Sequence, residues 1–212
     1  MARLEGAPRR RDPEGTRDDI LRVATQVFAE KGYAGARVDE IADLTRTTKR
    51  MIYYYFESKE ALYLRVLEAA YAGIRQVEKG LDVSDLPPLD ALRRLAEATY
   101  EHHTRHEDFV RLVAVENVHH GSHMADSAVI HDLNSTAIET LQDVIARGVA
   151  EGVFRDDIDA LDVHMLLSSF PIFAVGNRYT FRTLFDRDPL DPARQERNRR
   201  LAGEMIVRLL QR

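Results

Sequence analysis

The sequence predicts an all-α fold in which an N-terminal three-helix helix-turn-helix domain precedes a C-terminal helical bundle. Through most of the 212 residues, apolar side chains recur three and four positions apart, which is the period of an amphipathic helix. The period-two alternation that is typical of strands is absent from the sequence. Two short helical segments, residues 38–44 and 48–55, are separated by a turn at residues 45–47, which indicates a helix-turn-helix.

Composition and charge exclude several classes of protein. The chain has no cysteine, so disulfides and thiolate chemistry are excluded. No apolar run approaches the ~18 residues of a membrane span and no signal-peptide core is present, so we expect a cytoplasmic protein without a membrane partner. Residues 1–60 carry 12 basic and 11 acidic side chains, against 18 and 24 in the remainder. A basic footprint on an acidic chain favours local binding to a polyanion.

Three regions are expected along the chain. Residues 1–12 are predicted to be a disordered basic arm, whose Arg9-Arg10-Arg11 run is either a solvated tail or a segment that reaches DNA. Residues 13–60 are predicted to form the helix-turn-helix domain. Residues 61–212 are predicted to form a ligand-binding and dimerisation domain, with a ligand pocket and a dimer interface.

The N-terminal domain contains clear helix start and stop signals. The first helix is predicted to begin at Pro13, with Asp12 as its N-cap, and to end at Gly32. Thr48 is a suitable N-cap for the third helix, which Lys49 begins. The second helix places four apolar residues on one face: Val38, Ile41, Ala42 and Leu44.

The third helix carries side chains that a buried helix does not need. Three of them can turn inward, namely Met51, Ile52 and Tyr55, which leaves five for the outer face: Thr48, Lys49, Arg50, Tyr53 and Tyr54. Tyrosine rings offer apolar contact to sugars and thymine methyls, and their hydroxyls can donate to phosphate. Arg50 can read guanine through two parallel hydrogen bonds. Lys59 lies in the first turn of a helix that Ser58 caps, where a cation indicates a nearby anion such as phosphate.

These residues resemble a known family. Arg37–Leu62, with Thr16–Gly32 before it, resembles the DNA-binding domain of the TetR family of bacterial one-component repressors. The blocks that carry the resemblance are Ile20, Ala24 and Phe28 with Glu30-Lys31-Gly32-Tyr33, then Val38 to Ala42, Tyr53-Tyr54-Tyr55-Phe56, and Ser58-Lys59-Glu60-Ala61-Leu62.

The resemblance implies roles for particular positions on a double-stranded DNA operator. Three residues are expected to hold the phosphate backbone, Thr48, Tyr53 and Lys59, and three to face base edges, Lys49, Arg50 and Tyr54. Arg37 replaces the usual Thr or Ser cap and Arg46 the usual turn glycine, so both are candidates for extra phosphate contacts. The full set of predicted DNA-binding residues is Arg37, Arg46, Thr47, Thr48, Lys49, Arg50, Tyr53, Tyr54, Tyr55 and Lys59.

Six further helices are expected after the helix-turn-helix. A linker at Asp85-Leu86-Pro87-Pro88 separates the first two of them, and a break is expected at Gly121–His123. Pro171 is expected to kink the fifth, which is nearly apolar on every side. The predicted spans are Ser58 to about Gly80, Leu89 to Tyr100, Phe109 to His120, Ile130 to Val149, Asp159 to Thr180, and Asp191 to Gln211.

The last two of these helices have more apolar surface than one chain can bury, which predicts a homodimer with a four-helix interface. Polar groups on the Asp159 to Thr180 helix are expected to face residues 111–120, where they either belong to plain core and dimer contacts or line a pocket for a small-molecule effector. The segments KRMIYYYF, ENVHHG, GVFRDDID and GNRYTF resemble family members that respond to small metabolites. The predicted ligand-binding residues are Arg111, Glu116, Asn117, His120, Phe170, Phe173, Asn177, Arg178 and Phe181.

The favoured interpretation is therefore a ligand-controlled transcriptional repressor, and two alternatives remain open. The pairs His102/His106 and His119/His123 have the i, i+4 spacing of metal-binding imidazoles and could hold zinc or nickel with Glu116, as a metal-responsive regulator would. A helical adaptor that binds no DNA is the other. The favoured interpretation includes no metal site.

An enzyme is not expected. The sequence contains no Gly-rich phosphate loop, nucleophile elbow or metalloprotease motif. Asp156, Asp157 and Asp159 precede a helix, where carboxylates cap the free backbone N–H groups, so they do not indicate a catalytic pair. No cofactor is predicted.

Overall fold

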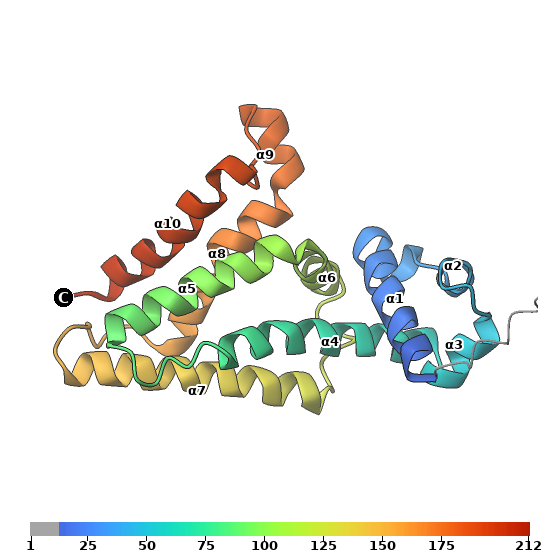
Figure 1. Cartoon of the computed structure of the whole chain (residues 1–212), viewed down its shortest axis with the longest axis horizontal. Helices are drawn as coiled ribbons and strands as arrows, with labels where there is room; N and C mark the ends of the chain where they lie inside the picture. Colours follow the sequence, from blue (N-terminus) through green and yellow to red (C-terminus); the bar gives the residue numbers. More distant parts are fainter. Residues whose placement is uncertain (1–12) are drawn as a thin grey trace, which may run out of the picture. The chain divides into compact units, whose positions relative to one another are not determined.

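The computed structural model describes residues 13–212, so the predicted basic arm lies outside the described residues. The described chain contains ten α-helices and no named strand, and its one β-bridge joins Phe154 to Gln211 (Figure 1). These helices confirm the predicted all-α fold. The chain divides into two compact units between Val66 and Leu67.

The first unit contains α1 (Pro13–Gly35), α2 (Val38–Leu44), α3 (Lys49–Phe56) and the start of α4 (Lys59–Lys79). The predicted stop at Gly32 is visible within α1, where this residue has a φ of 68° and interrupts the helical geometry. Glycine tolerates that left-handed conformation because it has no Cβ. The core of the unit is formed by buried residues from all four helices, among them Ile20, Phe28, Ile41, Ile52, Phe56 and Leu62.

The predicted caps of α3 and α4 are confirmed. Thr48 Oγ1 accepts a hydrogen bond from the Met51 amide at 3.3 Å, and Ser58 Oγ accepts one from the Ala61 amide at 3.0 Å. Each bond satisfies a backbone donor that the first turn of a helix leaves free. Arg46 occupies the turn with a φ of 51°, which a non-glycine residue rarely adopts.

One apolar assignment in α2 is wrong. Leu44 was expected on the same face as Val38, Ile41 and Ala42, yet its side chain is 59% exposed. At 100° per residue, Leu44 points about 110° away from the centre of the stripe that the other three residues form. The buried face of α2 therefore ends at Ala42.

The second unit is a helical bundle built around α5 (Figure 1). This helix packs against α6, α7, α8 and α10. Its buried side includes Leu92, Leu95, Ala96 and Tyr100. The helices after α4 are α5 (Pro88–Arg105), α6 (Glu107–Val118), α7 (Ala128–Ala150), α8 (Ala160–Gly176), α9 (Arg178–Phe185) and α10 (Pro192–Leu210).

The predicted single helix from Asp159 to Thr180 is wrong, because the chain breaks into two helices near its predicted C-terminal end. Helix α8 continues through Pro171 and ends at Gly176, and a separate helix α9 follows after Asn177 at an angle of 68°. Asn177 has a φ of −103° and a ψ of 11°, so the helical path ends there. Within residues 13–212, no single helix is both long and apolar enough to cross a membrane, and α8 and α9 reach that length and composition only as a bent pair.

The end of α7 is fixed by a close approach of two buried groups. The ring of Phe154, which has no exposed surface, lies directly against the backbone of Gly148. A Cβ at Gly148 would overlap the ring carbons. Since the ring is enclosed by core residues, it cannot move aside without opening the bundle.

We expect Gly148→Ala to lower the free energy of unfolding by about 1–3 kcal/mol, because overpacking outweighs the gain in helix propensity. Urea unfolding of the variant and wild type measures the difference. Gly176→Ala is the matched control, since no atom lies within 4 Å of its added Cβ. Equal stability of Gly148→Ala and wild type would show that the ring of Phe154 has room to shift.

Candidate functional site

Helix α3 has a buried side and an exposed side. Ile52 and Phe56 are buried in the first unit, with 0% and 3% of their surfaces exposed. Tyr54 is 76% exposed and Tyr53 is 37% exposed, while Tyr55 is half-buried. Lys49 and Arg50, in the first turn, are both exposed. The helix thus presents phenols and cations on one surface.

Two of the cations near α3 have partners within the protein. Lys49 Nζ lies 3.1 Å from Asp39 Oδ2 of α2. Lys59 Nζ lies 4.7 Å from the centre of the Tyr33 ring, and its partial burial lowers the pKa of the Lys59 amine. A cation–π contact leaves the outer side of an ammonium free to bind an anion. Any DNA contact by Lys49 must instead compete with Asp39.

The remaining predicted DNA-binding residues lie at the helix ends next to α3. Arg37 is exposed, stands at the N-cap position of α2 and makes no side-chain capping bond. Arg46 is exposed in the turn, and Thr47 beside it is half-buried. All ten residues of the predicted set are therefore in one unit, on or adjacent to α2, α3 and the start of α4.

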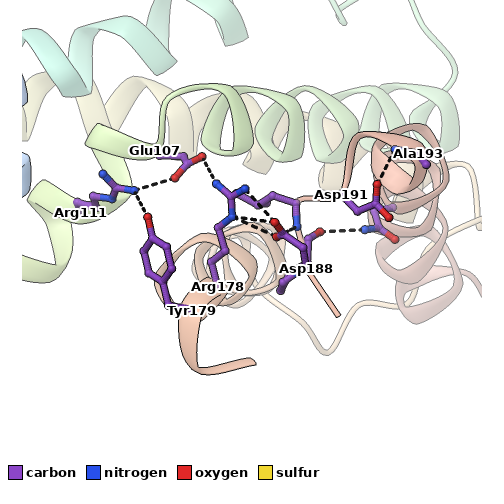
Figure 2. Close-up of polar contacts among 10 residues, drawn as sticks. Glu107, Arg111, Arg178, Tyr179, Asp188, Asp191 and Ala193 are labelled. Carbon is purple, nitrogen blue, oxygen red and sulfur yellow. Dashed lines mark hydrogen bonds and ion pairs between the residues drawn. The ribbon is translucent and has the colours of Figure 1, made fainter. Parts of the chain in front are cut away.

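Two of the predicted ligand-binding residues, Arg111 and Arg178, belong to an ion-pair network in the second unit (Figure 2). Arg178 donates to Asp188 from Nη2 at 2.9 Å and to Glu107 from Nη1 at 2.8 Å. Arg111 Nη2 also donates to Glu107, at 2.9 Å, and lies 3.4 Å from the Tyr179 hydroxyl. The hydrogen bond from Arg178 lowers the pKa of the Asp188 carboxyl. This network joins α6 to the segment around α9.

The other predicted ligand-binding residues are spread over several places. Phe170, Phe173 and Phe181 line a cavity of about 200 Å³ next to α10. Glu116 is buried near the end of α6, where its carboxylate accepts from the His123 amide at 2.8 Å. Three residues are exposed and do not line the cavity next to α10, namely Asn117, His120 and Asn177. The structure does not bring the predicted set together in one site.

A second cavity, which was not predicted from the sequence, lies between α4, α5, α6, α7 and α8. Its volume is about 370 Å³. It contains one ion pair, Arg75–Glu78, whose side chains are 10% and 15% exposed. A signal was present in the sequence, because Tyr71, Arg75 and Glu78 share one face of α4 and continue its apolar stripe. The lining residues include Tyr71, Arg75, Glu78, Thr99, His103, Phe109, Asn134, His164, Ser168 and Ile172.

The buried histidines of this region are neutral. Burial lowers the pKa of His103 to about 4 and that of His102, aided by its histidine neighbours, to about 3. Burial also lowers the pKa of His164, and the charge of Arg75 adds to this effect. His103 Nδ1 donates to the Thr99 carbonyl at 2.8 Å, so Nε2 of this neutral ring keeps its lone pair.

The two histidine pairs with metal-binding spacing, His102/His106 and His119/His123, make ring and hydrogen-bond contacts in the structure. His102 and His106 stack with ring centres 4.3 Å apart at an angle of 23°. His123 instead lies 3.2 Å from Glu116, and its ring is perpendicular to that of His119. Across residues 13–212, no group of three His, Cys, Asp or Glu side chains is placed to hold a metal ion.

Comparison with known proteins identifies the family. Residues 20–66 match the model of bacterial regulatory proteins of the tetR family. Residues 88–206, more than half of the chain, match the model described as "Tetracyclin repressor-like, C-terminal domain". The chain belongs to the tetR family. It is a DNA-binding transcriptional regulator and not an enzyme, and the family membership gives no support to a metal sensor or to an adaptor that binds no DNA.

Individual relatives agree with this assignment. The tetR-family chain is 37% identical over 183 residues to the transcriptional repressor NicS of Pseudomonas putida, covering 86% of each chain. It is 30% identical to the repressor SCO4008 of Streptomyces coelicolor, over 78% of this chain and 81% of the relative. The solved structure of the regulator SCO4942 from Streptomyces coelicolor aligns with a TM-score of 0.67 at 26% identity, over 92% of this chain and 98% of the other.

The neutral state of His103 makes stability depend on pH. The unfolded chain binds this proton below about pH 6.5, whereas the folded protein binds it only near pH 4. The contribution of the neutral His103 ring to the free energy of unfolding is therefore fully present above pH 6.5, and it is lost as the pH falls toward 4. We expect a loss of about 2 kcal/mol in the free energy of unfolding between pH 7 and pH 5 from this group alone.

Urea unfolding at both pH values, at one fixed protein concentration, measures this loss. His103→Asn keeps an N–H donor for the Thr99 carbonyl and should lose about 2 kcal/mol less between the two pH values than wild type does. His131→Asn is the control, since the His131 side chain is 82% exposed. If His103→Asn and wild type lose the same amount, His103 does not bear the linked proton.

Proposed function

We propose that this tetR-family protein is a cytoplasmic, homodimeric repressor that binds a palindromic operator through α3 and leaves it when a small molecule occupies the 370 Å³ cavity. The observation that carries the DNA-binding part is the two-sided α3. Ile52 and Phe56 anchor it, while Tyr53, Tyr54 and Arg50 are exposed. An eight-residue helix is too short to be stable alone, so burial of one side is what allows the other side to enter a major groove.

In this proposal, two kinds of contact are made by neighbouring residues. Thr48, Tyr53 and Lys59 hold phosphates, and Lys49, Arg50 and Tyr54 face base edges. The exposure of Arg50 and Tyr54 supports the second role, because both can reach a groove without a change in the backbone. The cation–π contact of Lys59 supports the first, since it directs an ammonium to the start of α4, where an anion also meets free backbone N–H groups.

Exposed apolar side chains on the helix pair α8 and α10 support the homodimer. Leu161 and Met165 on α8 are 63% and 62% exposed, and Met205 and Leu209 on α10 are 48% and 37% exposed. A two-fold pairing would cover these side chains with the same residues of a second copy. Two α3 helices about 34–36 Å apart would then read two half-sites of a palindrome.

The small-molecule part is supported by the cavity among α4 to α8. Its volume falls in the range of ligand pockets in helical bundles, and it combines aromatic walls with a few polar groups. A ligand that prefers one arrangement of the bundle weakens DNA binding by its difference in affinity between the two states, typically about 1–3 kcal/mol. Release by that mechanism requires no contact between ligand and DNA.

Selection of bound fragments from bacterial genomic DNA tests the proposal directly. We expect enrichment of an inverted repeat, and its position relative to promoters will show which genes are controlled. A protein that retains no duplex preferentially, even at low salt, would refute the repressor role. The selected operator then serves for the comparison of variants.

Arg50→Ala should relax the preference at one base-pair position in each half-site by about 1–3 kcal/mol, because bidentate reading of a base is lost. Tyr53→Phe removes only a hydroxyl and should weaken binding to specific and random duplexes alike, by about 0.5–1.5 kcal/mol. Fluorescence anisotropy with single-base operator variants measures both. A base-selective defect in Tyr53→Phe would assign it to reading, and unchanged selectivity in Arg50→Ala would remove that residue from base contact.

Leu209→Asp should give monomers with little affinity for the palindrome, because it places a charge in the proposed interface. Sedimentation at micromolar concentration measures the oligomeric state. Val118→Asp is the control, since this side chain is 75% exposed at the end of α6 and should leave the dimer intact. An intact Leu209→Asp dimer would place the interface on another surface.

A further inference from the structure

The Arg75 side chain has an incomplete set of partners inside the bundle. Its Nη1 donates to Glu78 Oε2, one turn along α4. Its Nε is completely buried and has no hydrogen-bond partner in the described part of the chain. The side chain is 10% exposed and lines the 370 Å³ cavity. A buried guanidinium N–H without an acceptor is rare in native proteins, so it indicates that an acceptor from outside the chain belongs beside it.

The described lining of the cavity contains one cationic and one anionic side chain. Of the described residues that line the cavity, Arg75 alone carries a full positive charge, because burial keeps His103 and His164 neutral. Glu78 is the one carboxylate among the lining residues. Burial raises the pKa of Glu78 even though Arg75 lies beside it. Glu78 is therefore a poorly solvated carboxylate that takes up a proton more readily than an exposed one.

The walls specify the rest of the ligand. Tyr71 and Phe109 meet edge to face with ring centres 5.4 Å apart, and Met165 and Ile172 add apolar surface from α8. His103, Ser168 and Asn134 add side chains with hydrogen-bonding groups to the lining. Glu78 already balances the charge of Arg75, so a monoanion with an apolar body can bind the guanidinium only when Glu78 takes up a proton or turns away. A dianion such as phosphate would leave one further charge without a partner.

We propose that the cavity binds a small organic carboxylate on the guanidinium of Arg75, with Glu78 as the internal anion that the ligand displaces. The proposal rests on the proposed function, in which a small molecule in this cavity controls DNA binding, and it specifies the chemical class of that molecule. With Glu78 displaced, the guanidinium can turn so that a carboxylate accepts from Nε and from a second N–H through two parallel hydrogen bonds.

Two substitutions separate this arrangement from a purely structural ion pair. Arg75→Gln removes the cation and should weaken carboxylate binding roughly 10- to 100-fold. Glu78→Gln removes the competing anion while it keeps the side-chain shape, and it should strengthen carboxylate binding several-fold. A structural pair predicts that both changes act in the same direction, through loss of stability. Arg93→Gln is the matched control, because Arg93 pairs with Asp90 at the same three-residue spacing but is 41% exposed.

The test uses full-length protein free of DNA and three probe acids, acetate, hexanoate and benzoate, each paired with its neutral amide. Isothermal titration calorimetry measures affinity, and far-ultraviolet circular dichroism confirms that each variant is folded. We expect at least one acid to bind about tenfold more tightly than its amide, with the opposite responses of the two variants given above. The control variant should bind as wild type does.

The proposal is overturned if none of the acids binds, if the amides bind as tightly as the acids, or if Arg75→Gln leaves acid binding unchanged. Fluorescence anisotropy with operator DNA in the same preparations distinguishes the two claims, namely that the cavity controls DNA binding and that its ligand is a carboxylate. Acid binding without any loss of operator affinity would refute control by this cavity and leave its ligand class intact. Operator release by a neutral molecule that needs neither Arg75 nor Glu78 would refute the carboxylate as the ligand class and leave ligand control of DNA binding intact.

Discussion

Burial of Ile52 and Phe56 anchors α3, and the functional surface of the first unit depends on it, because a helix of eight residues has too few internal hydrogen bonds to persist in water. The anchor fixes which side chains face outward. Once those two positions are inside, the 100° step of the helix places Tyr53 and Tyr54 on the solvent side without any further interaction. The Thr48 cap adds a defined start, so the direction of the exposed side is set by local chemistry together with two packed side chains.

The first unit could be predicted closely from sequence because its signals are local. Thr48, Ser58 and Gly32 mark helix ends through their own side chains or backbone, and the structure places each where the pattern indicates. The prediction that Leu44 is buried was wrong, because its three-residue spacing from Ile41 does not place it on the face that Val38, Ile41 and Ala42 share. The basic arm lies outside the described residues, and the roles of individual DNA-binding residues remain predictions, because spacing does not say which side chain meets a phosphate or a base.

The second unit was predictable in its helices and much less so in its cavity. Helix boundaries follow from periodicity, but the break at Asn177 was not predicted, although Gly176 lies directly before it. The expected kink at Pro171 stays a prediction. The predicted ligand-binding residues were chosen by their proximity in two sequence segments. The cavity is formed instead by five helices, and contacts such as those among Arg75, His103 and His164 depend on packing between positions far apart in the chain. The i, i+4 spacing of His102 and His106 likewise does not distinguish stacking from metal coordination.

The Arg178 network has a mechanical consequence for α9. No residue of α9 is buried, yet its two ends meet at one guanidinium, because Arg178 is the first residue of the helix and Asp188 follows its end. The segment from Arg178 to Asp188 is thus a loop that the Arg178–Asp188 ion pair closes and that Arg178 also attaches to Glu107 of α6. Such a segment can open and close as one cooperative piece while the core stays shut, so its amide hydrogens should exchange with solvent far sooner than those of α5.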